Sequence, residues 1–84
     1  MKTKAQIKAV IKEQRQNMLN SLNDAGSSTD IYKGIVIALE RVVYEKLTAR
    51  KVKKEMDFIM NNNNYSKKVT NGMMQSYEWV LRKD

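Results

Sequence analysis

The sequence predicts a small all-α protein, a bundle of three or four helices, and three observations favour this class. The 84-residue chain has no proline and only three glycines, so few residues interrupt a helix. Its apolar residues recur every three or four positions along most of the chain. An all-β fold of this size would need more turn residues than are present. The length predicts one domain over residues 1–84.

The first predicted helix covers residues 3–22. Its apolar stripe is narrow and is formed by Ile7, Ile11, Met18 and Leu22, with lysines elsewhere on the surface. Residues 23–29 then form a linker, because Gly26 can follow a helix end and several serine or threonine residues there can cap the next helix.

The second predicted helix begins near residue 29 and has the strongest periodicity. Its main stripe repeats every three or four positions and consists of Ile31, Ile35, Ala38, Leu39 and Val42. Further apolar residues widen this stripe to more than half of the helix, so we expect neighbours on more than one side. Gly34 and Ala38 lie four apart, which predicts that another helix approaches closely there.

The apolar pattern continues to residue 60, and two interpretations remain open. A single helix over residues 29–60 is favoured, because no glycine or proline interrupts it. The alternative is a break near residue 48, with Thr48 capping a separate helix.

The last predicted helix covers residues 66–82. The asparagine run at 61–64 ends the preceding helix, because asparagine side chains compete for backbone hydrogen bonds. Ser66 can cap the next helix, whose apolar stripe is formed by Val69, Met73, Tyr77 and Val80.

The residue types present argue against catalysis. The absence of histidine and cysteine removes thiol nucleophiles, imidazole bases and the usual zinc ligands. Neighbouring acids such as Glu55 and Asp57 point in different directions on a helix, and the three glycines are isolated, so no phosphate loop is present. We therefore expect a protein that is not an enzyme and that has no metal and no cofactor.

The net charge of +7 is concentrated in blocks. Residues 46–54 contain five basic groups and no acid, namely Lys46, Arg50, Lys51, Lys53 and Lys54. On a continuous helix four of these, all but Lys51, share one face. A basic ridge of this kind fits a phosphate backbone, because neutralising phosphates releases condensed counterions. The alternative interpretation is a solvated lysine-rich face that reflects base composition.

A helix-turn-helix arrangement can be placed on residues 48–81. Its second helix would present suitable side chains near its beginning, namely Lys67, Lys68, Asn71 and Gln75. The turn is longer than the usual three or four residues and lacks glycine, which argues against the motif.

These observations predict a nucleic-acid-binding regulator whose partner is DNA or RNA. The lysine and asparagine bias is also similar to that of accessory proteins of phages and mobile elements. The alternative function is therefore binding and inhibition of an acidic host protein through a helical surface that includes Trp79. Because no apolar run approaches the 20 or so residues of a membrane span, we expect a soluble cytoplasmic protein with no membrane partner. The generous apolar faces are compatible with a homodimer.

Overall fold

The computed structural model describes residues 1–22, 29–62 and 64–82 of the chain. These residues form four helices and no strand, which confirms the predicted all-α bundle. The helices are α1 (Lys4–Ser21), α2 (Thr29–Tyr44), α3 (Ala49–Asn61) and α4 (Lys67–Leu81).

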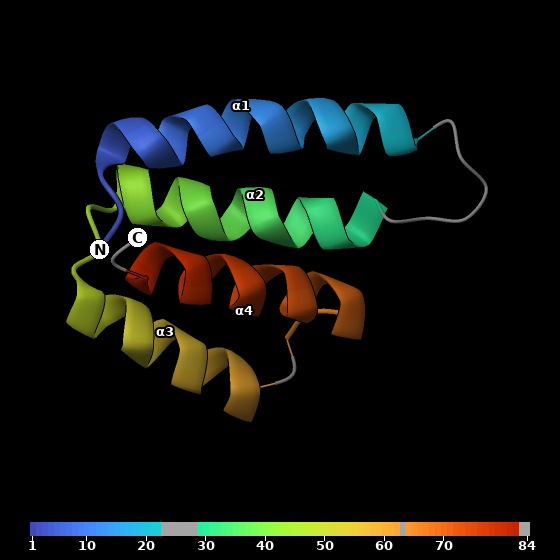
Figure 1. The fold of residues 1–84 in the computed structure, drawn as a ribbon. Helices are drawn as coiled ribbons and strands as arrows, with labels where there is room; N and C mark the ends of the chain where they lie inside the picture. The colour runs from blue at the N-terminus through green and yellow to red at the C-terminus, as the bar shows by residue number, and fades with distance from the viewer. Residues whose placement is uncertain (23–28, 63, 83–84) are drawn as a thin grey trace.

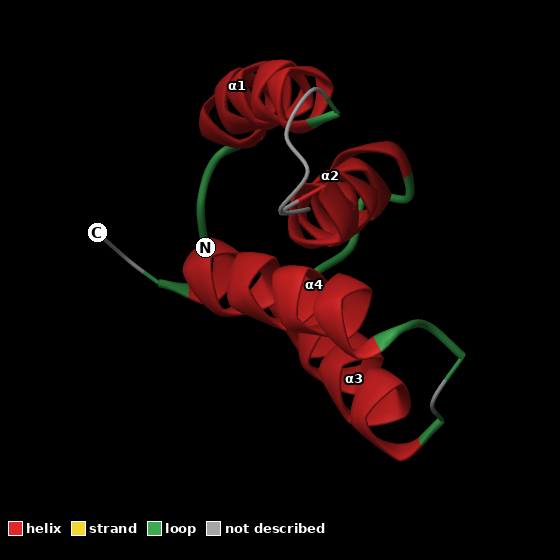
Figure 2. Ribbon diagram, turned by 90° about the vertical axis from the view of Figure 1, so that its right-hand side faces the viewer, coloured by secondary structure: helices red, strands yellow, loops and turns green. Residues whose placement is uncertain are grey.

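The helices lie side by side in the order α1, α2, α4, α3 (Figures 1 and 2). α1 and α2 run in opposite directions, and so do α3 and α4. The two inner helices, α2 and α4, run in the same direction, so α3 is the connection that returns the chain to the start of α4 (Figure 1). α2 therefore has a neighbour on two sides, as its wide apolar stripe predicts.

Two glycines allow α2 and α4 to approach each other closely. A methyl group at Gly34 would overlap the carbonyl oxygen of Val69, and a methyl group at Gly72 would overlap the carbonyl oxygen of Ile31. Ala38, one turn after Gly34, is fully buried. The predicted close approach at Gly34 and Ala38 is thus confirmed.

The interpretation of residues 29–60 as one continuous helix is wrong. α2 ends at Tyr44, and Lys46 has a left-handed backbone with φ of 53°. The Leu47 amide donates to the Val42 carbonyl at 3.1 Å, and both side chains are buried, which is the pattern of a Schellman C-cap. Thr48 then caps α3 by accepting a hydrogen bond from the Lys51 amide at 3.3 Å. The alternative interpretation is therefore correct: the helix is broken near residue 48, and Thr48 caps the helix that follows.

Local caps also define the starts of α1 and α4. Thr3 and Gln6 form a reciprocal capping box at the start of α1. Ser66 caps α4 by accepting from the Val69 amide, as the sequence predicts. The predicted linker features at residues 23–28 lie outside the described residues, but its two flanks meet, because the hydroxyls of Ser21 and Thr29 are 2.7 Å apart.

The core lies between the inner helices and is completed by the outer two. Met73, Tyr77 and Val80 of α4 and Leu39 of α2 are almost completely buried. α3 contributes few residues to it, since only Val52 and Ile59 of this helix are buried. None of the described helices is both long enough and apolar enough to span a bilayer.

Candidate nucleic-acid interface

Among the predicted site residues, those on the outward side of α3 form the largest group of exposed cations on one helix. Val52 and Ile59 turn inward towards α4. Because successive residues on a helix are rotated by about 100°, Arg50, Lys53 and Lys54 then point away from the bundle. All three are exposed, and Lys51 is exposed on the flank of the same helix. We call Arg50, Lys51, Lys53 and Lys54 the α3 basic face.

The α3 basic face makes no ion pair with any described residue. The nearby glutamates are already paired with Arg41 of α2. Its guanidinium donates two hydrogen bonds to Glu55, at 2.8 and 2.9 Å, and one to Glu45 at 3.0 Å. The bond to Glu45 is the largest cause of the raised pKa of Arg41. Asp57 lies on the exposed side of α3 but has no ion pair within the described residues.

Lys46 does not belong to the α3 basic face, which corrects the prediction of four cations in one helical row. It lies in the turn before α3, where its left-handed backbone removes it from the helical periodicity. Its side chain is exposed and lines a hollow together with Lys4 of α1.

The four predicted residues of α4 are all exposed, but they are not gathered with the α3 basic face. Lys67 and Lys68 lie at the start of α4, whereas Arg50 lies at the opposite end of the α3–α4 pair (Figure 1). Asn71 and Gln75 follow along the outward side of α4. Since α3 and α4 run in opposite directions, whereas the helices of a helix-turn-helix cross at about 90–120°, the motif stays a prediction without support from this arrangement.

Sequence reasoning did not place Lys4, Lys8 and Lys12 in a site. They are exposed, spaced by four residues along one flank of α1, and unpaired within the described part of the chain. The hollow shared by Lys4 and Lys46 shows that this flank lies beside the turn before α3. The repeat of lysine every four residues was visible in the sequence, but the proximity to Lys46 depends on how α1 packs against α2.

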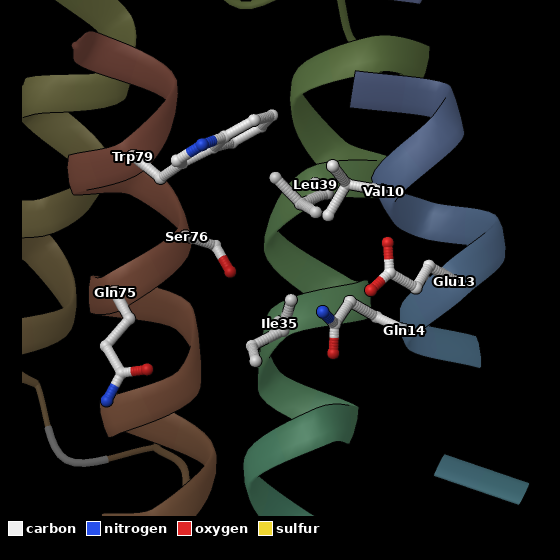
Figure 3. A pocket seen from close by; sticks show the side chains of 8 residues that line it. All are labelled: Val10, Glu13, Gln14, Ile35, Leu39, Gln75, Ser76 and Trp79. Carbon is white, nitrogen blue, oxygen red and sulfur yellow. The ribbon is translucent and has the colours of Figure 1, made fainter. Parts of the chain in front are cut away.

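Trp79, the predicted interaction residue, lies in a groove between α1 and α4 (Figure 3). The groove encloses about 260 Å³, and its floor is formed by Ile35 and Leu39 of α2. The indole ring forms one wall, and the ammonium of Lys2 lies 5.2 Å from the ring centroid. Trp79 is therefore partly covered by the N-terminal segment, which is itself held by a 2.9 Å hydrogen bond from the Lys2 amide to the Val80 carbonyl.

The described residues contain no cluster of three acidic side chains that could hold a metal ion. One buried titratable group stands apart from the charged surface. Burial raises the pKa of Tyr77 to about 12, and its hydroxyl has no hydrogen-bond partner among the described residues. Tyr77 is completely buried in the core and lines neither the groove beside Trp79 nor the hollow beside Lys46.

The chain matches no protein-family model, and comparisons with curated proteins and with solved structures also find no match.

Proposed function

We propose that this chain binds the phosphate backbone of a nucleic acid through the α3 basic face. The observation that carries the proposal is that four cations on one short helix are exposed and have no acidic partner within the described residues. Like charges at these spacings repel each other, so they weaken the helix slightly. A bound polyanion would relieve this repulsion.

The distribution of the acids supports the same proposal. Glu40, Glu45 and Glu55 are all occupied by two arginines, Arg15 and Arg41. These ion pairs use three acids but only two bases, and none of them neutralises a cation of the α3 basic face. An excess of lysine over arginine provides point charges for phosphates rather than the bidentate pairing that reads guanine, so we expect binding with little sequence preference.

A pair of matched charge reversals tests the proposal. Lys54→Glu changes a cation of the α3 basic face, whereas Lys33→Glu makes the same change at an exposed lysine of α2. Binding to a fluorescent DNA duplex and to an RNA hairpin is measured by anisotropy in 100 mM salt. We expect Lys54→Glu to weaken binding about tenfold, because a phosphate contact worth roughly 1 kcal/mol becomes a repulsion. Lys33→Glu should retain the wild-type affinity. Equal affinities for the two variants, or no binding by the wild type, would overturn the proposal.

A further inference from the structure

The seam between α1 and α2 carries two hollows on the side of α1 opposite the groove of Figure 3. Val10, which lines that groove, and Lys8, which lines a hollow, are two residues apart and point in nearly opposite directions on the helix. The first hollow encloses about 240 Å³ over a floor of Ile7, Val43 and Leu47. The second encloses about 420 Å³ around Ile11 and Tyr44. We call these two hollows together the α1–α2 seam.

Apolar side chains remain exposed along the α1–α2 seam. Tyr44 is 66% exposed and Leu19 is 55% exposed, and both line the second hollow. Met1 is also exposed and lines the first hollow. The floor residues Ile7 and Ile11 are buried, so the seam is a concave apolar strip with apolar groups along its edge.

The rim of the same strip is cationic. Lys4 and Lys46 border the first hollow, and Lys8 and Lys12 border the second. None of these four lysines forms an ion pair inside the described structure. Arg15, which also lines the second hollow, is paired with Glu40 of α2. The strip therefore combines an apolar floor with uncompensated positive charge on its edges.

We propose that the α1–α2 seam binds an acidic amphipathic helix of another protein. Such a helix would place apolar residues one or two turns apart into the two hollows and its carboxylates against the four lysines. The antiparallel pair α1 and α2 would then gain a third helix on its open side, in the way that α4 covers α2 on the other side.

Other occupants fit the seam less well. A nucleic acid has no aliphatic groups to bury over Ile7 and Ile11, so it would leave the apolar floor unused. A second copy of this chain would bring two rows of lysines together. A membrane surface favours protruding apolar side chains, whereas the two hollows are recessed.

The proposal is independent of nucleic-acid binding, because it uses a different face. The probe is a fluorescent synthetic helix of about five turns, with leucines on one face and glutamates elsewhere. A control peptide has the same composition with the leucines scrambled around the helix. Both are titrated with the wild-type chain, with Lys8→Glu/Lys12→Glu, and with the matched double reversal Lys53→Glu/Lys54→Glu on α3. Helicity by circular dichroism establishes that each variant folds.

The expected result is binding of the amphipathic peptide by the wild type, at least tenfold weaker binding by Lys8→Glu/Lys12→Glu, and less than twofold change in the α3 variant. The scrambled peptide should bind at least tenfold more weakly than its amphipathic counterpart. Tyr44→Ala, which keeps all charges, should also weaken binding several-fold. Equal binding of both peptides would show attraction by charge alone and would overturn the proposal. The proposal would also be overturned by unchanged binding by the seam variants, or by tighter binding to phosphatidylserine vesicles or to duplex DNA through Lys8 and Lys12. Finally, it would be overturned if no peptide bound up to about 1 mM, a dissociation constant that corresponds to a binding free energy on the order of 4 kcal/mol.

Discussion

Gly34 of α2 and Gly72 of α4 each lie directly against the backbone of the opposite helix, Gly34 beside Val69 and Gly72 beside Ile31. A side chain at either position would therefore meet backbone atoms, which cannot rotate away. This relationship explains why α4 contains a glycine in its interior even though glycine weakens a helix by about 1 kcal/mol relative to alanine. The cost in helix propensity is offset by the contact that joins the two inner helices.

The first prediction follows from that contact. Gly34→Ala and Gly72→Ala should each lower the free energy of unfolding by roughly 2 kcal/mol or more, because the overlap outweighs the gain in helix propensity. Asn71→Ala is the matched control, since Asn71 is exposed one residue before Gly72 and the change should stabilise α4 by a few tenths of a kcal/mol. Urea unfolding followed by circular dichroism gives all three values. Stabilisation by either glycine substitution would contradict the backbone contact.

The second prediction concerns the left-handed residue at the end of α2. Lys46→Gly should raise the free energy of unfolding by about 1 kcal/mol, because glycine adopts positive φ without the penalty that a Cβ carries. Lys46→Ala removes the same charge but keeps the Cβ, so it should have little effect. The difference between these two variants in urea unfolding isolates the backbone term. Equal stability of the two would mean that residue 46 does not hold this conformation.

The third prediction concerns alkaline pH. The pKa of Tyr77 is raised from about 10 in the unfolded chain to about 12 in the folded protein. Between these values the unfolded chain loses the phenolic proton and the folded protein keeps it, so the stability contributed by this group is complete below pH 10 and falls as pH rises towards 12. The loss is on the order of 2 kcal/mol at pH 12.

Tyr77→Phe separates this effect from the titration of lysines and of other tyrosines. Near pH 7 the variant should be about as stable as the wild type, because the lost hydroxyl has no hydrogen-bond partner among the described residues. Above pH 10 the variant should become the more stable protein, and the gap should widen with pH. Parallel stability curves for the two proteins from pH 8 to 12 would disprove the buried, protonated phenol.

Much of the fold is predictable from periodicity, because burial in helices follows spacings of three and four. All four residues of the predicted stripe Val69, Met73, Tyr77 and Val80 are buried. Burial agrees less well with the predicted stripe of the first helix, since Leu22 at its end is 64% exposed. Among the helices, the main neighbour of α1 is α2, so the apolar face of α1 is covered mostly from one side.

The break before α3 was harder to predict, for a local reason. Helix ends are normally recognised from glycine or proline, and residues 45–48 contain neither. Here the end is stabilised by the hydrogen bond from Leu47 to Val42 and by burial of Leu47, which together offset the cost of a left-handed lysine. The apolar residue at position 47 fits a continuing helix equally well, so its pattern alone does not separate the two alternatives.

The candidate interface was predictable only within one helix. Arg50, Lys53 and Lys54 share a face because helical geometry determines it from their spacing. The position of Lys46 depends on the turn, and its proximity to Lys4 depends on the packing of α1 against α2 across about forty residues of chain. Likewise, the ion pair between Arg41 and Glu55 could not be predicted from the sequence, because Glu55 lies beyond the break.

The fourth prediction concerns salt, and it tests the central claim that the α3 basic face binds a phosphate backbone. The measurement is the affinity for a DNA duplex, or for RNA if it binds more tightly, over a series of salt concentrations. For the wild type, the logarithm of the association constant should fall linearly with the logarithm of salt concentration, with a slope of about −3 or steeper. The triple variant Arg50→Gln/Lys53→Gln/Lys54→Gln should reduce the size of that slope by about 3, whereas Lys33→Gln should leave it unchanged. A wild-type affinity that does not respond to salt, or a triple variant with the wild-type slope, would contradict the account.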